Sequence, residues 1–281
     1  MEAFESYIRH HLPKAASFHP FYEKALGEML LAGGKRFRPR LLLGVVEALE
    51  PRLVENAYPV AMAIEVLHTY SLIHDDLPVM DDAPLRRGHP TLHVTYDHVT
   101  AVLAGDALNT LAFELLSDAP LPPKAVVALV KALAFNGGGA GMVLGQAIDC
   151  HFENHPLEVE ALEFLHIHKT GRLIAASLQM GGIVAQADPA LLESLYALGL
   201  DIGLLFQIED DIIDATQSAV QAGKTTGNDG EKNSFVNLLG LGGAKGKKQA
   251  LFLQVQEKMA ALPTPLKAAV EAVVLPYFSN E

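Results

Sequence analysis

The sequence predicts an all-α protein, and three observations support that prediction. Long apolar runs rich in Leu, Ala, Ile and Met fill most of the 281 residues, which is a composition typical of helices. Clusters of Gly and Pro separate these runs and mark where helices end. Segments that alternate β-branched and polar residues, as half-buried strands do, are scarce. Because 50% of the residues are hydrophobic, the chain can bury a large core and is not disordered as a whole.

We expect the helices in an order set by these Gly and Pro breaks: 4–30, 40–49, 57–76, 98–116, 123–136, 141–152, 159–186, 190–214, 245–261 and 264–277. The breaks themselves fall at 33–34, 87–90, 137–139, 188–189, 223–230 and Pro263. Apart from the Gly-rich segment 223–230, nothing has the composition of a flexible linker. Residues 1–281 are therefore predicted to form a single large helical domain.

Composition also excludes several classes of partner and site. The net charge of −12 argues against a nucleic-acid partner, which would require a basic face. Cys150 is the only cysteine, which excludes an internal disulfide and favours a reducing, cytoplasmic location. The first residues carry Glu2 and Glu5 and lack the apolar core of a secretory signal. No stretch of about 18 apolar residues is free of charges or breaks, so we expect no integral membrane span.

The expected helix 57–76 is apolar nearly all round, as a buried helix is, yet it ends in two adjacent carboxylates, Asp75 and Asp76. Its polar residues form a stripe, because His68 lies two helical turns before Asp75 and Thr69 two turns before Asp76. Adjacent carboxylates repel each other in a low dielectric. This end of the helix therefore requires a cation or basic partners.

A further carboxylate, Asp81, follows this pair after Pro78. A straight helix would not place Asp81 beside Asp75, but Pro78 disrupts the helical hydrogen bonding and could let a bulge turn Asp81 back. Clustered carboxylates with Arg86 and Arg87 just beyond suggest Mg²⁺ binding shared with a phosphate ligand. The alternative is an ordinary helix end that runs into a solvated acidic turn.

A second acidic cluster ends the expected helix 190–214. Gln207, Asp211 and Asp214 share one face at positions i, i+4 and i+7, and Asp210 also pairs with Asp214. Like charges at this spacing repel, and on an apolar helix the cost is relieved if a divalent ion neutralises them. The alternative is the solvated face of an amphipathic surface helix.

The few basic residues collect beside glycines, where they could meet a phosphate. The cationic and hydroxyl side chains concerned are Lys35, Arg38, Lys169, Thr170, Lys224 and Lys232. The group with Lys35 and Arg38 could equally be an ordinary solvated turn. His166 and His168 lack a third ligand at zinc spacing, so we expect them to be core or supporting histidines. The glycines at 137–141 neither follow a strand nor precede Lys-Ser/Thr, so we do not expect a P-loop or dinucleotide site there.

Two carboxylate clusters, basic loops and an apolar wall suit an amphipathic diphosphate with a hydrocarbon tail. In these segments the sequence strongly resembles the trans-prenyl diphosphate synthase family, and within it bacterial farnesyl diphosphate synthases. The resemblance covers nearly the full length, in order: GGKRFRPRLL at 33–42, HTYSLIHDDLPVMDDAPLRRGHPTLH at 68–93, GMVLGQAID at 141–149, HKTG at 168–171, FQIEDDIID at 206–214, GKTTG at 223–227 and KNSFVNLLG at 232–240.

The resemblance implies the isoprenoid synthase fold, a helical bundle around a deep central cavity, usually as a homodimer. It implies that an allylic diphosphate ionises, that its cation alkylates isopentenyl diphosphate, and that a proton is then lost. Two or three Mg²⁺ ions are expected, with Mn²⁺ possible, held by Asp75, Asp76, Asp81, Asp210, Asp211 and Asp214. The implied allylic diphosphate contacts are Arg86, Lys169, Thr170, Gln207 and Lys224. The implied isopentenyl diphosphate contacts are Gly34, Lys35, Arg38, His68 and Arg87, with Lys232 near a closing lid.

Tyr70, five residues before Asp75, lies where a bulky ring can close the floor of the cavity, whereas Ser71 does not obstruct it. This pattern resembles farnesyl synthases and predicts a C15 product, (2E,6E)-farnesyl diphosphate. Tyr70 could also be simple core packing, and the chain could instead make geranylgeranyl diphosphate. From a different class, it could be a non-catalytic subunit of a heteromeric prenyl synthase, although both aspartate motifs are intact. A class I terpene cyclase would carry an Asn/Ser/Glu motif in place of DDIID.

Overall fold

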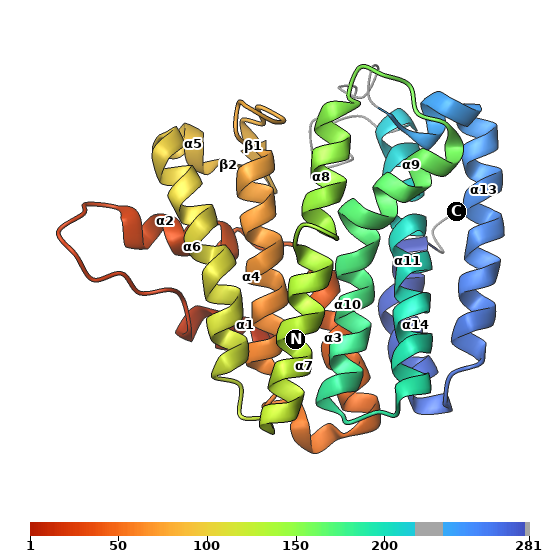
Figure 1. Ribbon diagram of the computed structural model, residues 1–281, viewed down its shortest axis with the longest axis horizontal. Helices are drawn as coiled ribbons and strands as arrows, with labels where there is room; N and C mark the ends of the chain where they lie inside the picture. Colours follow the sequence, from red (N-terminus) through yellow and green to blue (C-terminus); the bar gives the residue numbers. More distant parts are fainter. Residues whose placement is uncertain (217–232, 279–281) are drawn as a thin grey trace.

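The computed structural model describes residues 1–216 and 233–278, and within these ranges it consists of long helices that run side by side (Figure 1). The first half contains α1 Glu2–His10, α2 Tyr22–Leu31, α3 Phe37–Leu49, a 3₁₀ turn η1 Pro51–Leu53, α4 Tyr58–Asp75, α5 Leu92–Thr95 and α6 His98–Ser117. The second half contains α7 Pro123–Gly137, α8 Met142–His151, α9 Val159–His166, a π-helical segment η2 Ile167–Gly171, α10 Arg172–Val184, α11 Pro189–Thr216, α13 Phe235–Ala260 and α14 Thr264–Phe278. The described residues confirm the predicted all-α class.

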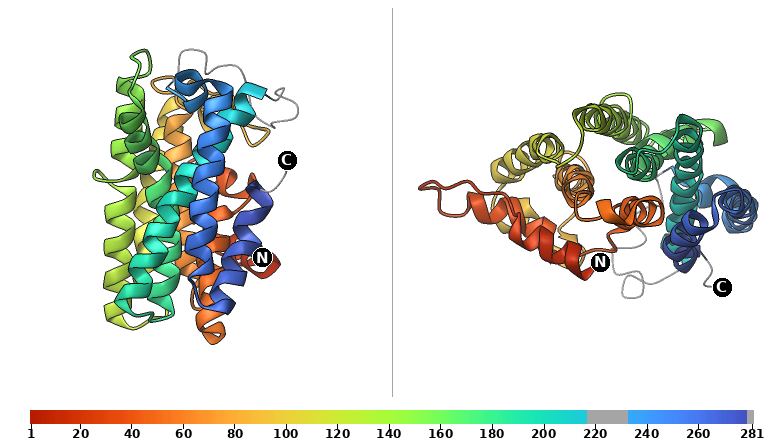
Figure 2. Two further views of the ribbon diagram at one scale, coloured as in Figure 1. Left: turned by 90° about the vertical axis from the view of Figure 1, so that its right-hand side faces the viewer. Right: turned by 90° about the horizontal axis from the view of Figure 1, so that it is seen from below.

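Helix α4 lies inside the bundle, with the other helices around it (Figure 2). It packs most extensively against α6 and also against α3 and α2. Most of its residues are buried, which agrees with a sequence that is apolar on every side. Because α4 is surrounded by other helices, the two aspartates at its C-terminal end are also drawn into the interior, where Asp75 is 8% exposed and Asp76 is 1% exposed.

Several expected boundaries were wrong, each for a local reason. The expected helix 4–30 is two helices, α1 and α2, separated by residues 11–21, a segment that contains Pro13 and Pro20. The helix expected at 245–261 begins earlier, at Phe235, and bends at Gly240, where φ is 71°. The helical stretch 159–186 was predicted as regular, but its middle winds into η2.

A two-residue hairpin, which the sequence did not predict, follows the first acidic segment. Strands β1 Leu85–Arg86 and β2 His89–Pro90 pair antiparallel, with Arg86 opposite His89. The turn residues Arg87 and Gly88 both have positive φ, at 54° and 78°, as the commonest two-residue hairpin turn requires. The hairpin presents Arg86 and Arg87 at the end of α4.

The helices that carry the site approach each other at their backbones. A Cβ atom added to Gly203 of α11 would lie 2.3 Å from the Cα atom of Gly171. A Cβ atom added to Gly145 of α8 would lie 2.2 Å from the backbone nitrogen of Lys169. Both distances are well below ordinary carbon contacts, so only glycine fits. The π-helical segment is thus fixed between α8 and α11.

Three segments are long and apolar enough to cross a membrane by length and composition: His98–Ser117, Pro123–His151 and Pro189–Thr216. This measure tolerates up to two charged residues in a window, whereas the sequence expectation concerned stretches free of charges and breaks. These helices take part in the bundle, where α6 contacts α4, α7 contacts α10 and α11 contacts α10.

Candidate active site

The first acidic segment folds back on itself at the end of α4. The backbone N–H of Asp81 donates to the carbonyl oxygen of Asp75 at 2.8 Å, and the N–H of Ala83 donates to the carbonyl of Asp76 at 3.1 Å. A six-residue return of this kind is not helical, and it is the turn that Pro78 was expected to allow. The carboxylates of Asp75, Asp76 and Asp81 therefore share one turn of chain.

This turn concentrates charge that is only partly compensated. Burial raises the pKa of Asp75, and the negative charge of Asp81 adds to the shift, while Lys169 and a hydrogen bond from Gln146 oppose it. Burial raises the pKa of Asp76 to about 6, against the opposing hydrogen bond from Arg86, whose Nε donates to Asp76 Oδ1 at 2.9 Å. A bound cation would favour the ionised form of both carboxyl groups.

Two residues of α8 support this cluster, and sequence reasoning assigned them no role. Gln146 Nε2 donates to Asp75 Oδ1 at 2.9 Å, and Lys169 Nζ lies 2.5 Å from Asp149 Oδ2. Burial lowers the pKa of Lys169, but the charges of Asp149 and Asp75 outweigh it and raise the pKa overall. Gln146 and Asp149 are three residues apart on an apolar helix, and this shared face is the signal that could have identified them.

The second acidic cluster lies on α11, which ends at the same end of the bundle as α4 (Figure 1). Asp211 is 8% exposed, and its Oδ2 accepts a hydrogen bond from the backbone N–H of Phe235 at 2.7 Å, which ties α11 to the start of α13. Asp210 and Asp214 are half-buried. Thr170 Oγ1 donates to Gln207 Oε1 at 2.8 Å, so the π-helical segment and α11 present their polar groups together.

The donor set suits Mg²⁺. Within residues 1–216 and 233–278, no three His, Cys, Asp or Glu side chains are gathered closely enough to form a complete cation site. Mg²⁺ characteristically takes one or two carboxylates, several waters and substrate phosphate oxygens, so it does not require a complete protein cage. The two aspartate clusters supply carboxylates of this kind, and in the first cluster the raised pKa values of Asp75 and Asp76 show negative charge that a bound cation would compensate.

The basic residues near the N-terminus gather around the hairpin. Arg87 Nη1 donates to the carbonyl of Gly33 at 2.6 Å, and a Cβ atom on Gly34, where φ is 119°, would lie 2.8 Å from Arg87 Cζ. Burial and the charges of Arg38 and Arg87 hold the pKa of His68 well below its usual value, so it is neutral. Lys35 instead lies over the ring of Tyr277, with Nζ 4.8 Å from the centroid.

Burial, reinforced by Arg87, lowers the pKa of Arg38 to about 10, while the nearby carboxylate of Glu65 opposes the shift. The structure therefore brings together Gly34, Arg38, His68 and Arg87. Lys35 is the member of the expected set that is directed elsewhere.

The remaining expected residues have different outcomes. Tyr70 is 6% exposed and meets His74 edge-on, with ring centroids 5.7 Å apart, while Ser71 Oγ donates to the carbonyl of His68 at 2.8 Å. Lys224 and Lys232 lie outside the described residues.

His166 is 5% exposed, both of its ring nitrogens lack a hydrogen-bond partner in the described part of the chain, and burial lowers its pKa to about 4.

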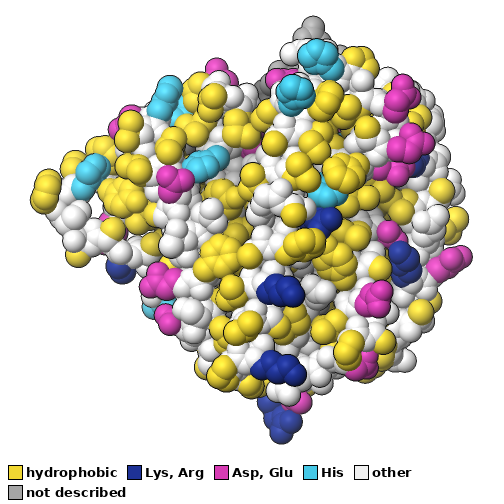
Figure 3. All heavy atoms as spheres, in the orientation of Figure 1, with side chains coloured by type: hydrophobic (Ala, Val, Ile, Leu, Met, Phe, Trp, Pro, Cys, Tyr) yellow, Lys and Arg dark blue, Asp and Glu magenta, His cyan; other side chains and the backbone are white. Residues whose placement is uncertain are grey.

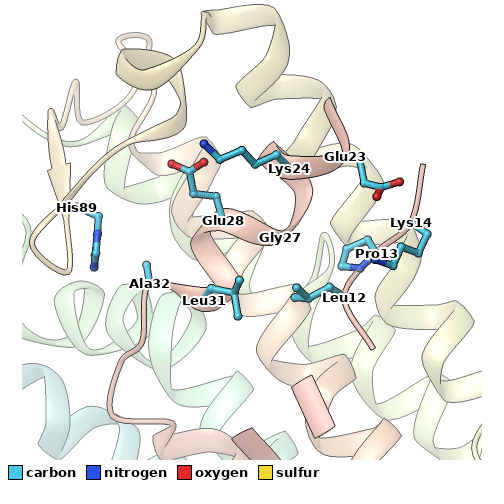
Figure 4. A pocket seen from close by; sticks show the side chains of 10 residues that line it. All are labelled: Leu12, Pro13, Lys14, Glu23, Lys24, Gly27, Glu28, Leu31, Ala32 and His89. Carbon is cyan, nitrogen blue, oxygen red and sulfur yellow. The ribbon is translucent and has the colours of Figure 1, made fainter. Parts of the chain in front are cut away.

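A separate surface hollow of about 600 Å³ lies between α2, the preceding segment and the hairpin (Figure 4). Its lining includes Leu12, Lys24, Leu31 and His89, and none of the aspartates of either cluster. The acidic and basic clusters described above are thus a distinct site.

Comparison with known proteins gives consistent results. The family model for polyprenyl synthetase matches residues 19–273. Farnesyl diphosphate synthase from Micrococcus luteus is 40% identical over 92% of this chain and 87% of the relative. A chloroplastic geranylgeranyl pyrophosphate synthase from Capsicum annuum is 44% identical over 81% of this chain and 62% of the relative. The crystal structure of a Helicobacter pylori geranyltransferase complexed with magnesium and isoprenyl diphosphate is 52% identical, with a TM-score of 0.95 over 99% of this chain and 95% of that chain.

Proposed function

The chain belongs to the polyprenyl synthetase family and is a prenyltransferase, and we propose that it condenses isopentenyl diphosphate with dimethylallyl or geranyl diphosphate to form (2E,6E)-farnesyl diphosphate. The observation that carries this proposal is the turn that joins Asp75, Asp76 and Asp81 beside Arg86 and Lys169. A buried acidic turn with the side chains of Arg86 and Lys169 beside it suits a diphosphate that binds together with a metal ion. We also propose that residues 1–281 form one catalytic domain.

The allylic half of the site is proposed to lie between the two acidic clusters. Mg²⁺, when bound, supplies positive charge that offsets the charge developing on the departing diphosphate. Asp75, Asp76 and Asp81 would hold two ions, and Asp210, Asp211 and Asp214 would hold a third. The magnesium in the similar Helicobacter pylori complex supports this assignment.

Protein cations complete the allylic half. Arg86 and Lys169 are held by Asp76 and Asp149, so their positions are set before a substrate arrives, and little reorganisation is required during reaction. Thr170 and Gln207 are uncharged and form a hydrogen-bonded pair, so they can face an allylic cation without reacting with it. Lys224 is proposed as a further diphosphate contact, and Lys232 as part of a lid.

The isopentenyl half is proposed to lie at the hairpin, with Gly34, Lys35, Arg38, His68 and Arg87 around the diphosphate. Neutral His68 can accept or donate a hydrogen bond there without adding charge. We identify no general base among these residues, and the released diphosphate is proposed to take the proton.

The product is proposed to be C15 because Tyr70, buried one and a half turns before Asp75, would stop a longer tail. Each further isoprene unit requires apolar space that the ring occupies, at about 0.8 kcal/mol per buried CH₂. The 44% identity to a geranylgeranyl pyrophosphate synthase favours a C20 product as the second candidate. A role as a non-catalytic subunit is disfavoured because both aspartate clusters are complete.

A homodimer is also proposed. Large apolar side chains are exposed on α6 and α7, among them Val99, Leu103, Val127 and Phe135, at 67%, 48%, 68% and 54%. Hydrophobic side chains spread across this face (Figure 3). Such a surface is typical of an oligomer interface, and light scattering after gel filtration would test it. The cytoplasm is the proposed location.

The experiment that tests the function is a product assay. Purified protein is incubated with labelled isopentenyl diphosphate and either dimethylallyl or geranyl diphosphate, with Mg²⁺ or with EDTA, and the products are separated by chain length. We expect a C15 product that depends on Mg²⁺. Equal activity in EDTA, or no product with either allylic primer, would contradict the proposal.

A further inference from the structure

A buried carboxylate lies among the arginines at the hairpin end of the site. Glu65 of α4 is 2% exposed, and its Oε1 lies 2.9 Å from Arg36 Nη1 and 3.6 Å from Arg87 Nη2. Its charge also acts on Arg38. One carboxylate therefore faces three guanidinium groups, of which Arg38 and Arg87 are the proposed diphosphate contacts.

All three guanidinium nitrogens of Arg36 donate hydrogen bonds to protein oxygens. Arg36 donates to Glu5 Oε1 at 2.8 Å, to Glu65 Oε1 at 2.9 Å and to the carbonyl of Leu30 at 2.7 Å, and its side chain is 4% exposed. Arg36 also precedes α3 with a left-handed backbone, φ 48°. Its contacts hold the start of α3, and with it Arg38, in a fixed relation to Glu65 on α4.

Arg87 is held from two directions. Its Nη1 donates to the carbonyl of Gly33 at 2.6 Å, and its Nη2 is the group that faces Glu65. Arg38 is less constrained, because its buried Nε has no hydrogen-bond partner among the described residues. Without an anion, Arg87 repels Arg38, and Glu65 is the carboxylate whose charge acts on both residues, while Asp76 acts on Arg87 more weakly.

We propose that Glu65 is a positioning residue for isopentenyl diphosphate: it holds Arg87 directly, and the start of α3 through Arg36, in the arrangement that accepts the diphosphate. This inference rests on the proposed function. If Glu65 positions the arginines, removing its charge should weaken diphosphate binding. Net charge alone predicts the opposite, because the pocket becomes more positive and should bind diphosphate more tightly.

The test is Glu65→Gln, which keeps the shape of the side chain and removes its charge. The matched control is Glu5→Gln, which removes the other carboxylate partner of Arg36 but no contact with Arg87. Binding of isopentenyl diphosphate to the metal-free protein is measured by calorimetry, together with KM for each substrate. For Glu65→Gln we expect the Kd and KM for isopentenyl diphosphate to rise about tenfold, because the variant loses the ion pair with Arg87 and the charge of the hydrogen bond from Arg36. We expect KM for geranyl diphosphate and kcat to change less than twofold, and Glu5→Gln to leave all four values within twofold.

Three results would overturn the inference: unchanged binding of isopentenyl diphosphate to Glu65→Gln, tighter binding, or a parallel loss for both substrates. If Glu65→Gln does not fold, Glu65→Asp is measured instead; its shorter side chain should weaken isopentenyl diphosphate binding selectively, and unchanged binding would again reject the role. Failure of the proposed function is recognised separately, because the wild-type protein would then bind no isopentenyl diphosphate at all.

Discussion

Substituting Gly203→Ala should separate two elements of the allylic site. The added Cβ would lie 2.3 Å from the Cα atom of Gly171, whereas carbon atoms in contact lie about 3.5–4.0 Å apart. Helix α11 and the π-helical segment must therefore move apart by roughly 1.2 Å or more. The 2.8 Å hydrogen bond from Thr170 to Gln207, which joins these two elements, would lengthen beyond hydrogen-bonding range.

The expected consequences are measurable in stability and in rate. Overpacking of this kind costs about 1–3 kcal/mol, which thermal unfolding detects. A displacement of about 1 Å in residues that position substrate can reduce kcat/KM by about 100-fold, and we expect this loss for geranyl diphosphate. The matched control is Gly242→Ala in α13, where an added Cβ meets nothing within 4 Å and helix propensity should make the change neutral or stabilising. Wild-type stability and kcat/KM in Gly203→Ala would refute the close-approach argument.

Three further predictions follow from individual contacts. Gly34→Ala should raise KM for isopentenyl diphosphate several-fold with little change for geranyl diphosphate, because the new Cβ would displace Arg87; equal effects on both substrates in steady-state assays would contradict this. Tyr70→Ala should yield products longer than C15 when isopentenyl diphosphate is in excess, and chromatography showing only C15 would remove Tyr70 as the floor. Burial lowers the pKa of His166 to about 4, below its unfolded value near 6.5, so the unfolded chain binds more protons at this residue between these pH values, and the contribution of His166 to stability should fall by up to about 3 kcal/mol as pH drops from 6.5 to 4. The raised pKa of Asp76 acts in the opposite direction over part of this range, so the prediction concerns the difference between two proteins. In denaturant titrations, the stability of His166→Leu relative to wild type should increase by up to that amount as pH falls from 6.5 to 4, and a difference that stays constant with pH would contradict it.

The sequence predicted the central helix α4 well because its composition indicates that it is buried. The expected range 57–76 agrees with the observed helix Tyr58–Asp75 to within one residue at each end. A helix that is apolar on every side has to lie in the interior. The return of Asp81 to Asp75 was also foreseeable, because Pro78 cannot continue the hydrogen bonding of α4. The break at 11–21 was missed even though two prolines, Pro13 and Pro20, marked it.

Features that depend on distant residues could not be read from local patterns. The π-helical segment 167–171 has the sequence of an ordinary helix, and its position depends on Gly145 and Gly203, which approach it from two other helices. The role of Glu65 depends on Arg36 and Arg87, whose side chains meet it only after folding.

The central claim is that the two aspartate clusters bind diphosphate through Mg²⁺, and calorimetry with inorganic pyrophosphate tests it most directly. The comparison is wild-type protein against Asp75→Asn and Asp211→Asn, which keep the acceptors for Gln146 and for the backbone of Phe235. We predict binding to the wild-type protein only with Mg²⁺ present, and binding weakened by at least about tenfold in each variant, as loss of a charged ligand implies. Equal binding of pyrophosphate without Mg²⁺, or undiminished binding to both variants, would contradict the account.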